Sequence, residues 1–396
     1  MKKINILYVH PSDELYGADR ILLQLVERLD KQRFYPIVVL PKDIEYDGLL
    51  SEALSEHKIK FLHLNLAVLR RRYFTLSGIL LYIFRLVVST MALVRVIQRE
   101  EIDIVHSNTL AIIPGALAAL LTGKPHVWHV HEIITRPRFL WRLTAWLSSR
   151  LSEKVVAVSE ATRYHLCKGD RQNEEKTVVI HNGIDGSRFG SGIGSGQKIR
   201  REWGISDKSL LVGMLGRFSD WKGQDYFLKV ASLVSNNHPD TRFALVGGTV
   251  PGEEDVVGRL KSLAVSLNLS SLVIFDEFRS DVPAILDAYD VFVLPSTRPD
   301  PFPTVILEAM ATGKPIVANA HGGSVEMIEH QITGFLVDPT RPEEMASAIE
   351  CLLKDPIRRR EMGRQGCERL INHFSLDAFV DKWTSLYESL ASQYKD

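Results

Sequence analysis

The sequence predicts an α/β protein made of two doubly wound domains in series, each a parallel sheet covered by helices on both faces. Short apolar runs alternate with helical stretches along the chain of 396 residues. The runs are continuously apolar rather than alternating, which is typical of strands buried on both faces of a parallel sheet. A Gly/Ser-rich break at 185–198 interrupts this alternation and predicts a loop near a domain boundary.

Apolar runs before the break predict the strands of the first domain, and those after it predict the strands of the second. The first set is 4–10, 35–40, 59–64, 102–108, 126–131, 154–159 and 177–182. The second set is 210–215, 242–247, 272–278, 290–296, 315–320 and 334–338. At roughly 100–200 residues per domain, we expect an amino-terminal domain over 1–185 and a carboxyl-terminal domain over 186–375. The remaining 376–396 predicts an amphipathic helix with Phe379, Trp383 and Leu386 on one face.

One segment, 75–94, is apolar over a length that could cross a membrane, for which about 20 such residues are needed. Arg85 lies near its middle and would cost about 2.5–3.5 kcal/mol on insertion scales. Predicted strands lie on both sides of the segment. We therefore expect a crossover helix of the first domain rather than a membrane span.

Composition excludes several classes of protein. Lys plus Arg and Asp plus Glu both number 48, so no net charge favours nucleic acid as a partner. The three cysteines form neither a C-x-x-C motif nor a Cys/His cluster, which predicts neither a disulfide framework nor a zinc site. The apolar run at the amino terminus is too short for a signal peptide. We expect a cytoplasmic protein.

The stretch PDPFPTVILEAMATGKP (299–315) contains two acids, Asp300 and Glu308. Pro303 suits the first turn of a helix that ends near Gly313. Asp300 then lies between the carboxyl end of a strand and the amino end of a helix, where open α/β sheets bind ligands and helix ends favour anions. Glu308 lies among apolar neighbours, and a buried carboxylate needs donors such as ribose hydroxyls. Taken alone, Glu308 could equally be a solvated helix residue.

Two further loops follow strands of the same predicted sheet. GMLGRFSDWKGQD (213–225) carries Arg217 and Lys222, which can clamp a diphosphate, although surface charge is the plainer alternative. AHGGSVEMI (320–328) carries Gly322 and Gly323. Three such loops at one sheet edge favour a single anion-binding site.

These motifs resemble family 4 of the retaining glycosyltransferases, which have the two-domain GT-B fold with Rossmann-like domains facing across a cleft. The resemblance covers nearly the whole chain. It rests on PSTRPDPFPTVILEAMATGKPIVANAHGG, which matches the family's E-x7-E signature, on GRFSDWKG and on HNGID (181–185). One departure is Asp300, where the signature usually has Glu.

The resemblance implies roles for individual residues. Arg217 and Lys222 would bind the donor pyrophosphate, Glu308 the ribose and Asp300 the transferred sugar, with Gly322 and Gly323 approaching sugar or phosphate. In the first domain, Gly17 of YGADR would face the phosphate and His131 of HVHE the sugar, although a core histidine is the plainer alternative. The catalytic set would be His131, Asp300, Arg217 and Lys222. Further donor contacts are expected from Phe278, Arg279, Pro301, Phe302 and Thr304.

The predicted activity is transfer of a sugar from a UDP- or GDP-sugar to a hydroxyl acceptor, with retention. The donor is a substrate, and no cofactor is expected. No D-x-D motif occurs in the sequence, so we expect cation-independent charge neutralisation and no metal site. The alternatives are a non-hydrolysing sugar-nucleotide epimerase and a non-catalytic nucleotide-sugar-binding subunit of the same fold. A dinucleotide-dependent oxidoreductase is disfavoured because GIGSGQ lacks G-x-G-x-x-G spacing and follows no strand.

Positive charge is segregated in the predicted acceptor domain. No Asp or Glu occurs from His57 to Arg99, a stretch that includes Arg70, Arg71 and Arg72, and a second acid-free stretch covers 133–152. Basic residues near an anionic leaflet contribute about 1 kcal/mol each. The plainer alternative is a solvated face over a crossover helix. The sharper hypothesis is a peripheral enzyme on the inner face of the cytoplasmic membrane with a lipid-linked glycan acceptor, as in bacterial polysaccharide or lipopolysaccharide synthesis.

Overall fold

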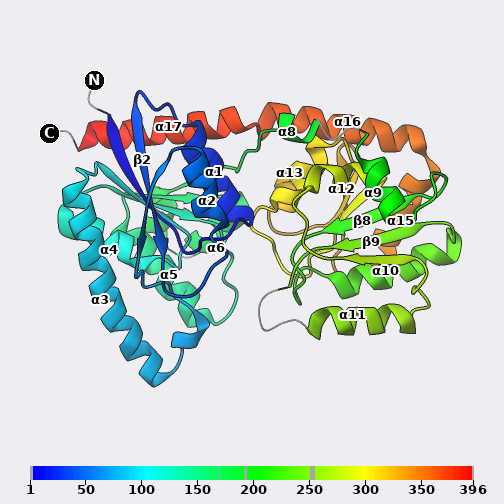
Figure 1. Cartoon of the computed structure of the whole chain (residues 1–396), viewed down its shortest axis with the longest axis horizontal. Helices are drawn as coiled ribbons and strands as arrows, with labels where there is room; N and C mark the ends of the chain where they lie inside the picture. The colour runs from blue at the N-terminus through cyan, green and yellow to red at the C-terminus, as the bar shows by residue number, and fades with distance from the viewer. Residues whose placement is uncertain (1–2, 169, 191–193, 250–254, 395–396) are drawn as a thin grey trace. The chain divides into compact units, whose positions relative to one another are not determined.

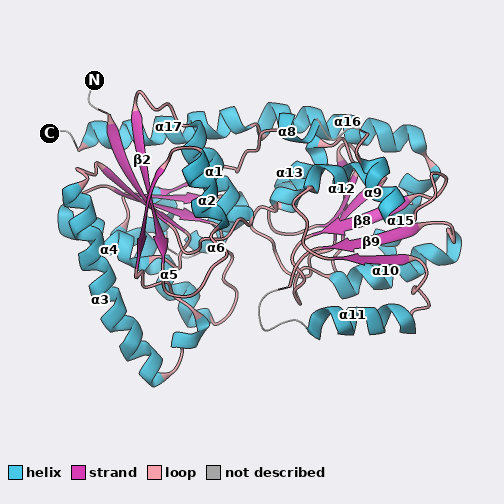
Figure 2. Cartoon of the chain, in the orientation of Figure 1, coloured by secondary structure: helices cyan, strands magenta, loops and turns pink. Residues whose placement is uncertain are grey.

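The chain folds into two compact units. The structure is a computed structural model that describes residues 3–168, 170–190, 194–249 and 255–394 (Figures 1 and 2). One unit comprises Met1–Gly183 with Leu376–Asp396, and the other comprises Ile184–Ser375. We expected boundaries at 185–186 and 375–376. The structure has the first between 183 and 184 and the second between 375 and 376. Part of the predicted linker, 191–193, lies outside the described residues.

The polypeptide passes between the units twice, and the residues beside the two passages are paired. Ile184 forms a parallel bridge with Ser375, and its amide donates to the Phe374 carbonyl at 3.2 Å. The HNGID motif therefore ends in a short backbone pairing with the segment that leads into the last helix.

In the described residues, the first unit contains a seven-stranded sheet with the order β3-β2-β1-β4-β5-β6-β7, and its strand pairs are parallel. The strands are β1 (Ile4–Val9), β2 (Phe34–Pro41), β3 (Lys60–Leu64), β4 (Ile104–Asn108), β5 (His126–Val130), β6 (Lys154–Ala157) and β7 (Thr177–Val179). The helices are α1 (Gly17–Arg28), α2 (Leu49–Glu56), η1 (Arg71–Tyr73), α3 (Leu76–Arg99), α4 (Ile113–Thr122), α5 (Arg138–Leu151), α6 (Glu160–Cys167) and α7 (Arg171–Lys176). Each predicted run forms a strand.

The second unit repeats this winding. Its described residues form a six-stranded sheet with the order β10-β9-β8-β11-β12-β13, again with parallel pairs. The strands are β8 (Leu211–Leu215), β9 (Arg242–Val246), β10 (Val273–Asp276), β11 (Val291–Leu294), β12 (Ile316–Asn319) and β13 (Gly334–Val337). The helices are α8 (Ser187–Gly190), α9 (Gly196–Glu202), α10 (Gln224–Asn237), α11 (Asp255–Ser266), α12 (Val282–Ala288), α13 (Thr304–Ala311), α14 (Ser324–Met327), α15 (Pro342–Lys354) and α16 (Pro356–His373).

Both strand orders have a topological switch point, where the winding reverses. In the first unit it lies between β1 and β4, and in the second between β8 and β11. Ligands of open α/β sheets bind outside the carboxyl ends of the strands at this point. The two-domain α/β prediction is therefore confirmed, and each unit has one edge where a site is expected.

The last helix, α17 (Leu376–Gln393), packs on the first unit. Trp383 and Tyr387 are fully buried, and the Tyr387 hydroxyl lies 2.8 Å from Nδ1 of His106 in β4. The buried face is centred on Trp383 and Tyr387 with Phe379, whereas Leu386 is only half-buried. Phe379 and Trp383 of the predicted face are therefore buried as expected, whereas Leu386 lies at the edge of that face and Tyr387 is buried instead.

Helix α3 is the predicted crossover helix. By length and composition it is the one helix among the described residues that could cross a membrane, and only 28% of its most apolar window is buried. It connects β3 and β4, which are parallel strands of one sheet. Both ends of the crossover must return to that sheet, so α3 does not span a bilayer in this fold.

Candidate active site

In the second unit, three loops at the carboxyl ends of neighbouring strands interlock. Gly223 adopts φ 82°, and a Cβ there would lie 2.1 Å from the Pro295 carbonyl oxygen, so the loop after β8 packs closely on the end of β11. The amide of Thr297 donates to the Trp221 carbonyl at 2.8 Å. Only glycine permits this approach at position 223, and the consequence is that Lys222 is held beside the loop that carries Asp300.

Lys222 and Asp300 form an ion pair. Lys222 Nζ lies 2.5 Å from Asp300 Oδ2, and the ammonium also lies 4.3 Å from the centre of the Trp221 ring. Asp300 is 6% exposed. The sequence placed these two residues at one site in separate roles, toward phosphate and toward sugar, and the structure brings them into direct contact.

Helix α13 starts at Thr304, directly after the N-cap residue Pro303. Glu308 lies in the second turn and is 8% exposed, so of the two alternatives left open by the sequence, a solvated helix residue is wrong and a buried one is right. Phe302 is also buried, with its ring 5.7 Å from that of Phe374. Phe302 therefore anchors the loop in the core of the unit.

Gly322 and Gly323 are needed for packing. A Cβ on Gly322 would lie 2.3 Å from the Asp300 carbonyl oxygen, and one on Gly323 would lie 2.4 Å from that of Pro301. The Gly323 amide donates to the Asp300 carbonyl at 2.8 Å. This amide therefore holds the Asp300 loop in place, and the glycines position the acid from the next strand.

The predicted nucleotide-contacting pair Phe278 and Arg279 follows β10. A Cβ on Gly248 would lie 3.2 Å from Cβ of Phe278, so the loops after β9 and β10 are adjacent, and Phe278 is half-exposed. Arg279 pairs with three carboxylates, those of Glu202, Asp276 and Asp281. Hydrogen bonds to Asp281 and Glu202 raise the pKa of Arg279 further. Its guanidinium supports the loop rather than pointing to an open surface.

Arg217 follows β8 and is half-buried. Its carbonyl accepts a hydrogen bond from Nε2 of the buried Gln224 at 3.0 Å, which fixes the backbone of the loop at the start of α10. Arg217, Lys222, Asp300 and Gly322 thus lie on loops after β8, β11 and β12, the three strands at the switch point.

The first unit places a chain of polar side chains at the corresponding strand ends. His10 follows β1, Asn108 ends β4 and His131 follows β5. His10 Nε2 lies 2.5 Å from Asp19 Oδ1, His10 Nδ1 lies 2.8 Å from Asn108 Nδ2, and Asn108 Oδ1 lies 2.9 Å from His131 Nε2. All three contacts are satisfied when Asp19 accepts from His10, His10 accepts from Asn108, and Asn108 accepts from His131 Nε2–H.

The beginning of α1 fixes the acid at the end of this chain. Gly17 is the first residue of α1, and the Tyr16 amide donates to Asp19 Oδ2 at 2.8 Å. Burial opposes ionisation of Asp19, but hydrogen bonds from His10, Ser12 and Tyr16 outweigh it and hold the pKa of Asp19 below its usual value. The result is a carboxylate that orders His10, then Asn108, then His131.

Burial and the neighbouring His10 lower the pKa of His131 to about 3. The imidazole is therefore neutral at physiological pH, with Nε2 donating to Asn108 and Nδ1 left as an acceptor. The adjacent Glu132 accepts from the amides of Leu110 at 3.2 Å and His131 at 3.1 Å. Burial raises the pKa of Glu132 to about 7 despite these hydrogen bonds.

His10, Asp19, Asn108 and Glu132 were not predicted from the sequence. A signal was available, because His10 and Asn108 follow the two strands on either side of the switch point, where polar residues at strand ends indicate a site. His10 and Asn108 lie outside the motifs that resemble the family. Asp19 and Glu132 lie within YGADR and HVHE, but only Gly17 and His131 of these motifs were assigned roles.

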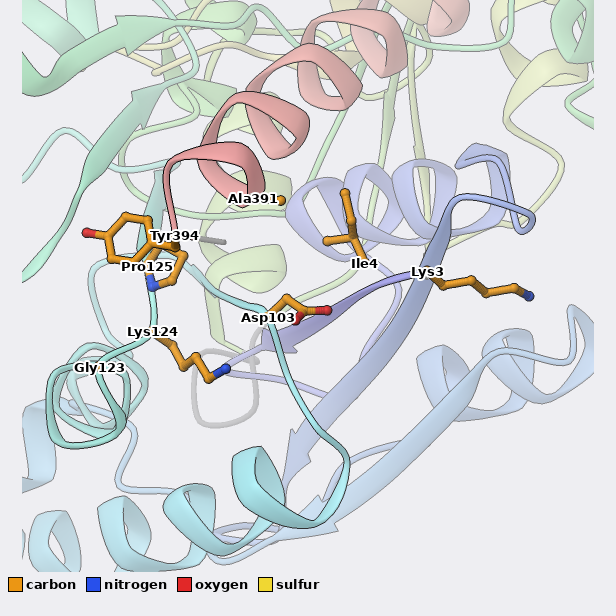
Figure 3. Close-up of a pocket in the computed structure, with 8 residues that line it drawn as sticks. All are labelled: Lys3, Ile4, Asp103, Gly123, Lys124, Pro125, Ala391 and Tyr394. Atoms are coloured by element: carbon orange, nitrogen blue, oxygen red, sulfur yellow. The ribbon is translucent and has the colours of Figure 1, made fainter. Parts of the chain in front are cut away.

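The opposite edge of the first sheet has a different character. A cavity of about 90 Å³ near the amino ends of β1, β4 and β5 is lined by Ile4, Asp103, Lys124 and Tyr394, among others. In Figure 3, Lys3 points away from the other labelled side chains. Ligand pockets for small molecules are usually about 300–1,000 Å³, so this hollow is too small for a nucleotide sugar. Among the described residues, no group of three or more His, Cys, Asp or Glu side chains could hold a metal ion.

Comparison with known proteins places the chain in a family. Residues 195–369 match the model of glycosyl transferases group 1, and residues 16–188 match that of glycosyltransferase family 4. Over 97% of both chains, the sequence is 25% identical to the Escherichia coli UDP-Gal:alpha-D-GlcNAc-diphosphoundecaprenol alpha-1,3-galactosyltransferase. It is 29% identical to the alpha-maltose-1-phosphate synthase of Mycolicibacterium smegmatis over 74% of this chain and 80% of that protein.

Solved structures agree with this assignment. Anabaena HepE in complex with UDP superposes with a TM-score of 0.82 at 27% identity, covering 98% of this chain and all of that one. WaaG, a glycosyltransferase involved in lipopolysaccharide biosynthesis, superposes with a TM-score of 0.72 at 17% identity over 97% of this chain and 99% of that one, a likeness of fold alone. The chain belongs to the family 4 type of glycosyltransferases, with the GT-B fold. The family resemblance expected from the sequence is confirmed.

Proposed function

We propose that this glycosyltransferase moves a sugar from a UDP-sugar to a hydroxyl of a lipid-linked glycan, with retention and without a metal ion. The observation that carries the donor half is the Lys222–Asp300 ion pair at the switch point of the second sheet. In this proposal, the pair supplies a cation for phosphate and an acid for sugar hydroxyls at one sheet edge, where β8 and β11 end. HepE, the structural relative, is known in complexes with UDP and UDP-glucose.

The donor would exchange the partners of this pair. The β-phosphate of the nucleotide takes the Lys222 ammonium, and Asp300 is then released to accept hydrogen bonds from the sugar. Arg217 adds a second cation, and Glu308 accepts hydrogen bonds from the ribose hydroxyls. Two fixed cations can neutralise a leaving diphosphate electrostatically, which is why no metal ion is needed in this proposal.

In the transfer step, the bond from the anomeric carbon to the β-phosphate oxygen breaks, and the electron pair leaves with UDP. The acceptor oxygen forms a new bond to the same carbon on the same face. The acceptor proton passes to the departing phosphate oxygen. The neutral His131, with its Nδ1 available as an acceptor, suits a hydrogen bond with a sugar hydroxyl rather than proton transfer.

The acceptor proposal rests on a relative. The Escherichia coli galactosyltransferase has, by its name, a diphosphoundecaprenol-linked acceptor. An acceptor of that class would bring this enzyme to the inner face of the cytoplasmic membrane as a peripheral protein, in polysaccharide or lipopolysaccharide synthesis.

The test compares UDP, UDP-glucose and the matching guanosine ligands in a thermal-shift screen of the full chain. A ligand at 100 times its Kd stabilises by about 2.7 kcal/mol, so UDP should raise the melting temperature clearly and EDTA should leave that shift unchanged. Calorimetry of Asp300→Ala should show UDP-glucose binding weakened more than UDP binding. An equal loss for both ligands would assign Asp300 a structural role, and stabilisation by guanosine ligands alone would reject the UDP-sugar proposal.

Turnover separates the remaining alternatives. Incubation with the UDP-sugar that binds, with and without a polyprenyl-diphosphate-linked sugar, should give a glycosylated lipid only when acceptor is present. Epimerised nucleotide sugar in the absence of acceptor would indicate an epimerase. Binding without any turnover in either reaction would favour a non-catalytic subunit.

A further inference from the structure

Helix α3 is inverted over its first four turns, with apolar side chains outside and small or polar ones inside. Leu80 and Phe84 are 68% and 66% exposed. The exposed large apolar residues of this helix are Leu76, Ile79, Leu80, Leu81, Ile83, Phe84, Val87, Val88 and Met91. At 100° per residue they cover roughly half the circumference. The buried face includes Gly78, Ser89 and Thr90, the reverse of the pattern of a helix exposed to water.

Helix α5 has the same inversion. Thr144, Ser148 and Ser149 are buried, and their hydroxyls donate to carbonyls of the same helix. Phe139, Leu143 and Trp146 are exposed, Phe139 by 61%. The start of α5 lies beside the residues that precede α3, where the Phe74 and Phe139 rings lie 6.4 Å apart in an edge-to-face contact. The exposed apolar residues of α3 and α5, with Phe74, form one surface, called here the α3–α5 face.

The centre of this face is apolar, and arginine side chains lie at its edge. Arg85, the one charged residue within the apolar part of α3, turns back so that its Nη1 donates to the Tyr73 hydroxyl at 3.0 Å. Within the described residues, Arg71, Arg138 and Arg142 are exposed and have no ion-pair partner. The end of α3 is polar, with exposed Arg95 and Arg99. Figure 1 shows the amino-terminal end of α3 projecting beyond its unit.

Two of the arginines expected to bind lipid have another role. Arg70 Nε donates to Asp43 Oδ2 at 2.7 Å and Arg72 Nη2 donates to the same oxygen at 3.2 Å, and the Asp43 side chain is fully buried. Replacing Arg70 and Arg72 together would leave the buried Asp43 carboxylate without its ion-pair partners. The Arg70–Arg71–Arg72 triple variant would therefore test the fold rather than lipid binding, and only Arg71 of the three is left for lipid.

We infer that the α3–α5 face inserts into one leaflet of an anionic bilayer. An apolar face of this extent on a soluble unit marks an interaction surface. A basic edge without acids complements anionic headgroups, and exposed Phe139 and Trp146 suit the boundary between headgroups and acyl chains. Insertion is shallow, since β3 and β4 hold both ends of α3 in one sheet. The inference rests on the proposed function only for its biological purpose, access to a lipid-linked acceptor.

The experiment measures co-sedimentation of the full chain with vesicles of phosphatidylethanolamine and phosphatidylglycerol, and with phosphatidylcholine vesicles. Leu80→Ser/Phe84→Ser/Val87→Ser should lower binding to anionic vesicles at least tenfold. Arg71→Ser/Arg138→Ser/Arg142→Ser should reduce the preference for anionic lipid and its dependence on salt. The matched control is Ile357→Ser/Ile371→Ser on α16 of the other unit, where both residues are equally exposed, and it should bind as the wild type does.

A second measurement does not depend on serine variants folding. In a Trp146→Phe background, which removes the tryptophan already present on this face, the tryptophan introduced as Phe84→Trp should add fluorescence that brominated acyl chains quench. The tryptophan introduced as Ile357→Trp in the same background should not be quenched. Equal quenching at both positions, or wild-type binding by the α3 variant, would overturn the inference. A third result would also overturn the inference. If light scattering shows that the wild type is a dimer that does not bind vesicles, and that the α3 variant is a monomer, then the α3–α5 face joins two copies of the chain. UDP binding by calorimetry is run alongside: if UDP binds and vesicles do not, the membrane inference alone has failed.

Discussion

The two units use the same three strand positions for their candidate sites, yet they hold the sites by different physics. In each sheet the first, fourth and fifth strands end at polar residues: β1, β4 and β5 in one, β8, β11 and β12 in the other. The first unit joins His10, Asn108 and His131 through side-chain hydrogen bonds. The second joins Lys222 and Asp300 through an ion pair.

Under the proposed function, this difference would match the parts of a sugar-nucleotide donor. A diphosphate needs fixed cations, and an ion pair that can exchange partners keeps a lysine buried without a ligand. A sugar hydroxyl needs an oriented neutral donor or acceptor, and a hydrogen-bonded chain fixes the tautomer of an imidazole. The same fold edge therefore supplies charge in one unit and orientation in the other.

The largest expected contrast between the units is their response to acid. Burial lowers the pKa of His106 and His129 well below the usual value and that of His126 to about 3. The unfolded chain binds protons on these groups below about pH 6.5, and the folded unit does not. Stability is therefore lost as pH falls from about 6.5, by roughly 1.4 kcal/mol per pH unit for each buried histidine.

At pH 5.5, hydrogen exchange followed by mass spectrometry should show the first unit losing protection before the second, by several kcal/mol. His126→Gln should reduce the acid-induced loss of stability by the contribution of one buried histidine. Equal loss in both units would mean that the histidines do not set the acid sensitivity.

The second contrast concerns charge. Lys222→Ala should reduce transfer at least tenfold, about 1.4 kcal/mol or more, because the donor diphosphate loses its cation and Asp300 is left buried without its partner. Steady-state transfer and circular dichroism are measured together. Lys229→Ala, an exposed lysine of the same unit, is the control and should transfer normally. Full activity in a folded Lys222→Ala protein would remove the ion pair from the donor site.

The third contrast concerns orientation. Asn108→Leu keeps the volume but removes both hydrogen bonds of the chain, so that His131 is no longer held with Nε2 as the donor. We expect kcat to fall about fivefold, near 1 kcal/mol, while the Kd for UDP measured by calorimetry stays unchanged. A weaker UDP affinity with the same kcat would mean that Asn108 supports the fold of the site rather than the orientation of His131.

The sequence predicted the fold more completely than the site. Every apolar run that was predicted to be a strand became one, because buried parallel strands need continuous hydrophobicity and this is a local property. Lys222 and Asp300 were predicted individually, but their mutual contact depends on the backbone approach at Gly223, which no local pattern encodes. The His10–Asn108–His131 chain joins residues far apart in sequence. The inversion of α3 also escaped prediction, because composition indicates an apolar helix but does not say which face the neighbouring helix covers.

The smallest expected effect comes from Glu132, the buried acid beside the neutral His131. Its folded-state pKa of about 7 lies above the usual value of 4.5, so between these pH values the folded protein holds a proton that the unfolded chain has released. This component of stability therefore falls as pH rises from about 4.5 to 7, opposite in sign to the histidine effect. Glu132 keeps some exposure to solvent, which screens part of the difference, and we expect about 1 kcal/mol.

Glu132→Gln isolates this component, because glutamine stays neutral and keeps an oxygen that can accept from the Leu110 amide. The variant should gain stability relative to the wild type at pH 8 but not at pH 5, a shift in melting temperature of about 2–4 °C for a unit of this size. Chemical denaturation at the two pH values measures the difference directly. A gain of the same size at both would come from packing rather than from the proton, and Glu132 would then be an ordinary ionised carboxylate held by its two amide donors.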